Sequence, residues 1–87
     1  MKEINIITEL DGKQPISRSQ AKILCNKFFD CNEVVIDFSG ALWMGQGFAH
    51  QLFVVFTREH PDIQLLPINM NDDVNKMYKH VTVEALN

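Results

Sequence analysis

The sequence has no run of basic residues and no long apolar stretch. Its 87 residues carry eight Lys and Arg against eleven Asp and Glu, a net charge of −3. Nucleic-acid binding needs clustered positive charge, and anionic membranes attract polybasic segments, so we expect neither nucleic acid nor membrane as a partner. The longest apolar run, residues 52–56, is far too short to span a bilayer.

Cysteine is also scarce. Cys25 and Cys31 form no disulfide-rich pattern, which is typical of a reducing compartment. Neither lies at metal-ligand spacing from a histidine, and we therefore expect no metal site and no cofactor. Acidic residues interrupt residues 1–9, which do not resemble a secretory signal, so we expect a cytoplasmic protein.

Few glycines and prolines divide the chain, and no linker, repeat or low-complexity segment is present. The residues are 46% apolar and 22% charged, which is ordinary for a globular protein. Because this length suffices for one domain and not for two, we predict a single domain over residues 1–87. Its last residues, 82–87, are predicted to be a frayed tail.

Three segments have the composition of strands. Residues 3–10 alternate with a period of about two, which predicts a strand. Residues 34–38 are nearly continuous and β-branched, as in a strand covered on both faces. Residues 63–68 form a third apolar run, and Pro67 marks it as an edge strand or as near its end.

Helical periodicity predicts three helices, over residues 18–30, 48–59 and 72–81. Ser17 and Gln20 form a capping box ahead of the first helix, and Asn71 is a favourable N-cap for the third. Strands that alternate with helices indicate an α/β fold containing a parallel pair, with right-handed crossovers.

Short motifs follow one another in the order found in a known family. They are Ile16–Ala21, Asp37-Phe38, Gly45-Gln46-Gly47-Phe48-Ala49, His60-Pro61-Asp62 and Pro67–Asn71. This series resembles the STAS domain of anti-sigma factor antagonists and, more closely, a STAS-like family of unknown function. The resemblance covers about residues 12–81. It implies a small α/β domain with a mixed sheet of about four strands, three helices packed on it, and a role in binding a partner protein.

The chain departs from these relatives at the turn before the second helix. Regulated antagonists carry a Ser or Thr there, and its phosphorylation by a partner kinase disrupts docking. Here Gln46 or Gly47 occupies that place, and residues 40–56 contain no Ser, Thr or Tyr. We therefore predict no phosphorylation at this turn. The acidic pair that tends to follow Phe-Ala in the family is also replaced, by His50-Gln51.

The carboxyl ends of the strands are where we predict the partner site, because open α/β sheets usually bind there and the resemblance marks the same loop. Trp and Met are typical of interface centres, and Gln and His suit orientation at a helix start. The candidate partner-binding residues are Trp43, Met44, Gly45, Gln46, Gly47, Phe48 and His50. Trp43 could equally belong to the core. The glycines could bind an anion, but close packing is favoured because no Lys or Arg is adjacent.

No base–nucleophile arrangement is recognisable, so we expect no enzyme. Asp37 is expected to cap the turn at Ser39-Gly40. Three functions remain open. The first is docking on a regulatory partner such as a kinase-like ATPase or an anti-sigma factor, with a homodimer also compatible. The others are a phage or mobile-element inhibitor of a host complex, and a small-molecule or nucleotide-binding domain that uses the turn 45–47. The fold alone does not choose among them.

Overall fold

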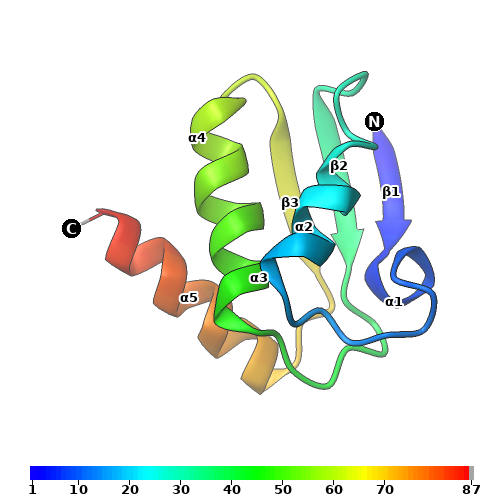
Figure 1. Cartoon of the computed structure of the whole chain (residues 1–87), viewed down its shortest axis with the longest axis vertical. Helices are drawn as coiled ribbons and strands as arrows, with labels where there is room; N and C mark the ends of the chain where they lie inside the picture. The colour runs from blue at the N-terminus through cyan, green and yellow to red at the C-terminus, as the bar shows by residue number, and fades with distance from the viewer. Residues whose placement is uncertain (87) are drawn as a thin grey trace.

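Three parallel strands form the sheet, in the order β1-β2-β3. The computed structural model describes residues 1–86. The strands are β1 (Lys2–Asn5), β2 (Glu33–Asp37) and β3 (Gln64–Ile68) (Figure 1). The predicted mixed sheet of about four strands is therefore wrong for the described residues. The α/β class is confirmed, and β3 is an edge strand, as Pro67 indicated.

Four helices connect and flank these strands. They are α1 (Ile6–Glu9), α2 (Arg18–Cys25), one long composite helix, and α5 (Asp72–Leu86) (Figure 1). The composite helix consists of three consecutive segments: α3 (Gln46–His50), the π-helical segment η1 (Gln51–Phe56) and α4 (Thr57–Glu59). The three predicted helices are present, but the first ends at Cys25 instead of about residue 30, and α1 is additional. Four helices replace the expected three because the predicted first strand is cut short by a turn of helix.

That first strand ends at Asn5 instead of residue 10. The Oδ1 atom of Asn5 accepts a hydrogen bond from the backbone N–H of Thr8 at 3.0 Å and so caps α1. Positive φ angles at Asp11 and Gly12 then turn the chain. Local capping outweighs the alternation of apolar residues that suggested a longer strand.

The end of the chain also differs from the prediction. Helix α5 continues to Leu86, so the expected frayed tail begins too early, and Asn87 lies outside the described residues. Val81 is buried in the core, and the hydroxyl of Thr82 donates to the carbonyl of Tyr78 at 2.8 Å. Packing of Val81 therefore holds the helix beyond the predicted boundary.

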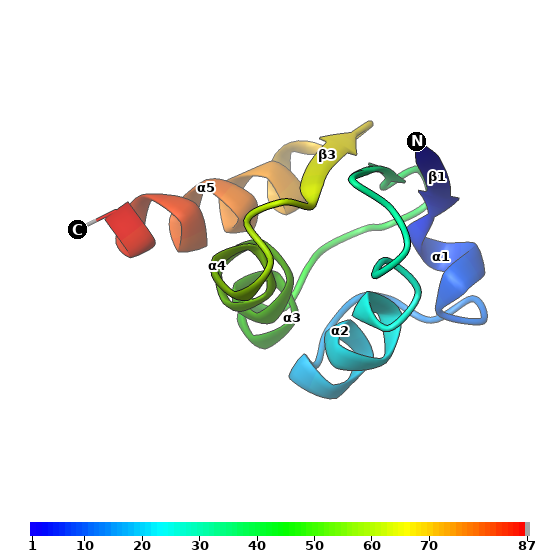
Figure 2. The same ribbon diagram turned by 90° about the horizontal axis from the view of Figure 1, so that it is seen from above.

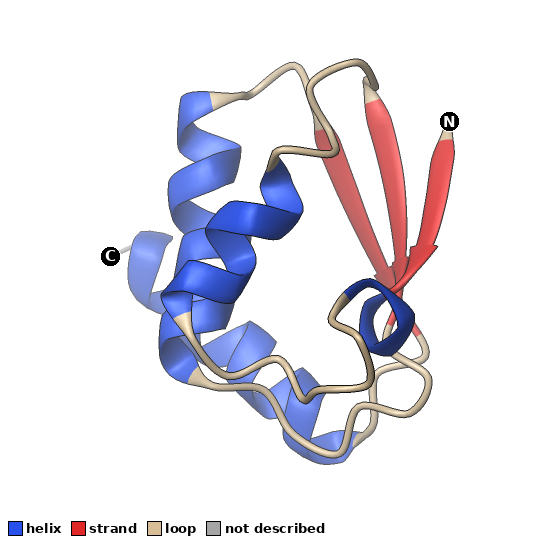
Figure 3. Ribbon diagram, turned by 45° about the vertical axis from the view of Figure 1, so that its right-hand side comes forward, coloured by secondary structure: helices blue, strands red, loops and turns tan. Residues whose placement is uncertain are grey.

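The helices cover only one face of the sheet. Figure 2 shows α2, α3 and α4 on one side of the strands and α5 beyond the edge at β3, and Figure 3 shows the same layers from the side. Ile4, Val34 and Ile36 face the helices and are buried. Val35 is only half-buried, so the expectation that the central strand is covered on both faces is wrong. The core lies between this one face and the helices.

Candidate functional site

The loop between β2 and α3, residues 38–45, lies at the carboxyl end of the sheet. It begins with a turn held by Asp37, whose Oδ1 atom accepts hydrogen bonds from the Ser39 N–H at 2.9 Å and the Asn69 side chain at 3.0 Å. These hydrogen bonds lower the pKa of the Asp37 carboxyl from 3.8 to about 2. The bond from Asn69 is the largest cause, and bonding to Ser39 is the next largest. The prediction that Asp37 caps this turn is confirmed.

Gln14, which lies before α2, braces the loop from one side. Its Oε1 atom accepts from the Leu42 N–H at 2.8 Å, and its Nε2 atom donates to the Gly40 carbonyl at 3.3 Å. One side-chain amide thus satisfies both a donor and an acceptor of the loop backbone.

Asn71, at the start of α5, braces the loop from the other side. Its Nδ2 atom donates to the carbonyls of Ala41 at 3.1 Å and Leu42 at 3.0 Å. Its Oδ1 atom accepts from the Val74 N–H at 2.8 Å, which confirms the predicted N-cap. The same side chain therefore begins a helix and fixes the loop 30 residues away.

Between these braces the loop exposes two large apolar side chains. Leu42 is 66% exposed and Trp43 is 46% exposed, whereas Ala41 and Met44 on either side of them are buried. We call the pair Leu42 and Trp43 the loop tip. Trp43 is therefore not simply a core residue, and Leu42, which the sequence analysis left out of the candidate site, is the more exposed of the two.

Two of the predicted contact residues are inaccessible. Met44 is 2% exposed and Phe48 is fully buried, since both face the core beneath the sheet. Their assignment to the partner site is wrong, because a side chain without exposed surface cannot contact a partner. They anchor the loop and the start of α3 instead.

One glycine of the turn, Gly45, serves the close packing favoured above. The Gly45 N–H donates to the carbonyl of Pro15 at 2.9 Å, and a Cβ atom at Gly45 would lie 2.1 Å from the carbonyl oxygen of Ile16. The φ of Gly45 is −73°, so space and not backbone strain requires glycine here. Gly47 is less constrained, since its Cβ would lie 3.4 Å from the Arg18 nitrogen.

Beside this turn is a hollow of about 360 Å³, lined by Arg18, Gln46, Gly47 and His50. No Lys or Arg is adjacent to this turn in the sequence, but the fold brings Arg18, the first residue of α2, to it. The capping box of Ser17 and Gln20, confirmed in the structure, fixes where α2 begins. Gln46 is exposed and His50 is half-buried, so both can contribute to the surface beside the loop tip.

A comparison with family models identifies the segment that carries this loop. A model described as a STAS-like domain of unknown function matches residues 20–75. The chain belongs to this family. The matched segment covers more than half of the STAS-like chain and includes β2, the whole loop, β3 and the start of α5. Comparison with curated proteins gave no match, and comparison with solved structures gave none.

Among the described residues of this STAS-like domain, no three His, Cys, Asp or Glu side chains lie together as metal ligands would. No described helix has the length and apolar character required to cross a bilayer. The three remaining predicted contacts that have accessible side chains, Trp43, Gln46 and His50, lie on or beside the braced loop. Leu42, Gln14, Asn71 and Arg18 are not among the predicted site residues, although the apolar run 42–44 could be read as core or as an exposed patch and Asn71 had a local signal as a helix cap.

Proposed function

We propose that this STAS-like domain binds a regulatory protein through the loop tip and has no catalytic activity of its own. The observation that carries the proposal is the exposure of Leu42 and Trp43 on a loop whose backbone is fixed by Gln14 and Asn71. Tryptophan is among the residues that supply most of the binding free energy at protein interfaces.

The bracing matters because an interface loses free energy when it must order its own loops. Hydrogen bonds to the backbone of Gly40, Ala41 and Leu42 hold the loop before any partner arrives. A loop already in its bound conformation avoids much of the entropy cost of association. We propose a kinase-like ATPase or an anti-sigma factor as the class of partner, on the resemblance to anti-sigma factor antagonists. Gln46, which is exposed, and His50, which is half-buried, are the proposed polar rim contacts.

The absence of catalysis is supported by the state of Asp37, the carboxylate closest to the loop in sequence. It already accepts hydrogen bonds from Ser39 and Asn69, and its pKa is lowered to about 2. A general base or acid works best when its pKa lies near the operating pH, and Asp37 is far from that condition. Its role is to hold the turn.

The test compares partner affinity with fold stability in the same variants. A partner is isolated from native cells by capture on the domain, produced separately and titrated by calorimetry. We expect Trp43→Ala to weaken binding by about 2 kcal/mol or more, roughly thirtyfold, with an unchanged melting temperature. Leu42→Asp should weaken binding further.

The matched control is Val83→Asp, which places the same charge at another exposed apolar residue, on α5. It should leave the affinity unchanged. If Trp43→Ala lowers the stability but leaves the affinity of the folded fraction unaltered, or if Val83→Asp weakens binding as much as Leu42→Asp does, the loop tip is not the partner site.

A further inference from the structure

The outer edge of β3 presents unpaired backbone groups. Gln64 donates its N–H to the Asn32 carbonyl and Ile68 accepts from the Phe38 N–H, both at 2.9 Å, so these residues bond toward β2. Alternate residues of a parallel strand bond to the opposite side. The N–H and carbonyl of Leu65 and the carbonyl of Pro67 therefore point away from the sheet. No loop, cap or side-chain hydrogen bond of the described residues reaches them.

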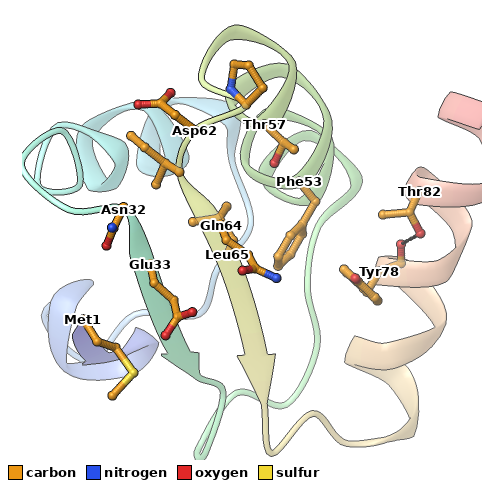
Figure 4. A pocket seen from close by; sticks show the side chains of 12 residues that line it. Met1, Asn32, Glu33, Phe53, Thr57, Asp62, Gln64, Leu65, Tyr78 and Thr82 are labelled. Carbon is orange, nitrogen blue, oxygen red and sulfur yellow. Dashed lines mark hydrogen bonds between the residues drawn. The ribbon is translucent and has the colours of Figure 1, made fainter.

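A hollow of about 650 Å³ lies beside this edge, between β3 and α5 (Figure 4). We call it the β3–α5 groove. Leu65 lines it from the strand, Tyr78 and Thr82 line it from α5, and Phe53 of η1 lies between the two elements. The rings of Phe53 and Tyr78 meet edge to face, with their centroids 4.8 Å apart. The groove thus combines a strand edge with an aromatic floor.

The charged side chains that line the groove are both acidic. Glu33 and Asp62 line it, and no Lys, Arg or His side chain is among its lining residues. A groove lined by carboxylates favours positively charged groups, and it disfavours a segment that carries Asp or Glu.

We propose that the β3–α5 groove binds an extended, basic peptide segment of a partner protein, which pairs with β3 as a fourth strand. Addition of a strand to a free sheet edge obtains affinity from main-chain hydrogen bonds and specificity from alternate side chains. Leu65 donates one hydrogen bond to the segment and accepts another. Pro67 accepts a further one but donates none, so the paired segment is short.

The side chains of the bound segment then alternate between two environments. Those on one side are apolar and pack on Tyr78, which is only partly buried. Those on the other side are Lys or Arg, within reach of Glu33 and Asp62. Because Glu33 and Gln64 begin their strands whereas the loop tip follows the end of β2, this groove is at the opposite end of the sheet. The inference therefore stands independently of the loop-tip proposal.

The experiment titrates the full chain, labelled with ¹⁵N, with a short acetylated peptide in which Val and Lys alternate. We expect chemical-shift changes confined to the groove, at Leu65, Tyr78, Thr82 and their neighbours. The same peptide with Glu in place of Lys should bind at least about fivefold more weakly, and added salt should narrow that difference.

Three variants and one charge-matched control identify the source of binding. Leu65→Pro removes the outward N–H without removing a bond to β2 and should abolish the titration. Glu33→Gln with Asp62→Asn should weaken the Lys peptide about fivefold, whereas Asp11→Asn with Glu84→Gln, which removes equal charge elsewhere, should not. Thr82→Lys places one positive charge against the two carboxylates and should narrow the preference for the Lys peptide, and this variant keeps the test decisive if Leu65→Pro does not fold.

Three results would each overturn the inference. The Lys peptide could leave every shift unchanged, it could shift residues of the loop 38–45 instead of the groove, or it could bind no better than the Glu peptide. None of these results changes the outcome expected for partner binding by the Trp43→Ala variant. Failure of the groove proposal can therefore be distinguished from failure of the loop-tip proposal.

Discussion

Asn71 and Leu42 are joined by a hydrogen bond of 3.0 Å from a side-chain amide to a backbone carbonyl, although 29 residues separate them. The same amide caps α5 through its oxygen. The position of the loop tip and the start of the last helix are thus set by one side chain, and its two functions can be separated by substitution.

Asn71→Asp should keep the helix cap and release the loop. An aspartate oxygen still accepts from the Val74 N–H, but the donors to the Ala41 and Leu42 carbonyls are gone. We expect nearly unchanged α5 stability with faster amide exchange in residues 40–44. Asn71→Ala removes both functions and should also cost about 0.5–2 kcal/mol for the lost cap. Equal protection of the loop amides in the wild-type protein and in the Asn71→Asp variant would contradict the bracing role.

Gly45→Ala should destabilise the fold, and Gly47→Ala should not. At Gly45 the added methyl would approach the Ile16 carbonyl oxygen to 2.1 Å, so the backbone must move, at a cost of about 1–3 kcal/mol. At Gly47 the nearest atom is 3.4 Å away, and Ala is favoured over Gly inside a helix by about 0.5–1 kcal/mol. Urea denaturation of both variants measures the difference. Opposite signs are expected, and a stable Gly45→Ala variant would show that the loop has room to shift.

The stability contributed by Asp37 should depend on pH. Its folded-state pKa, about 2, is below its usual 3.8, so the ionised carboxylate stabilises the fold above pH 4 and this stabilisation is lost as the pH falls toward 2. We expect carbon-detected NMR titration to place the Asp37 midpoint near 2. Asn69→Gly removes the main donor while keeping a residue that tolerates the positive φ of 57° at this position. The Asp37 midpoint should then rise, and an unmoved midpoint would mean that Asn69 is not the cause.

Leu24→Ala and Phe53→Ala should each destabilise the domain by about 2–5 kcal/mol, because both side chains are buried and leave a cavity. Ile23→Ala is the control: Ile23 neighbours Leu24 in sequence but lies on the exposed side of α2, and its loss should change stability by no more than about 0.5 kcal/mol. Equal urea midpoints for Leu24→Ala and Ile23→Ala would show that the wrong face of the helix is assigned to the core.

Local chemistry explains which parts of the fold were predictable. The capping box of Ser17 and Gln20 and the N-cap at Asn71 involve neighbouring residues, so their spacing predicts the helix starts. The β-branched run predicts β2 to within one residue. The turn of α1 was missed because a single cap at Asn5 outweighs an alternation that continues beyond it.

The candidate site was predictable only in part, because its geometry depends on distant residues. Hydrogen bonds of Gln14 and Asn71 with the backbone of the loop fix its conformation, and this conformation leaves Trp43 exposed and Met44 buried. The approach of Arg18 to the turn at Gly47 depends on how α2 packs against α3. A side-chain amide that bonds to a backbone carbonyl nearly 30 residues away leaves no periodic trace in the sequence.

The all-parallel sheet has a consequence for how the chain folds. β1 meets β2 only after α1 and α2 have been traversed, and β2 meets β3 only after the long helix from α3 to α4. No two strands are joined by a hairpin, so the entropy of closing a long loop is lost before any ladder can form. A fragment that ends after α2 has a strand without a partner. The domain should therefore fold in one cooperative transition, and more slowly than a helical bundle of its length.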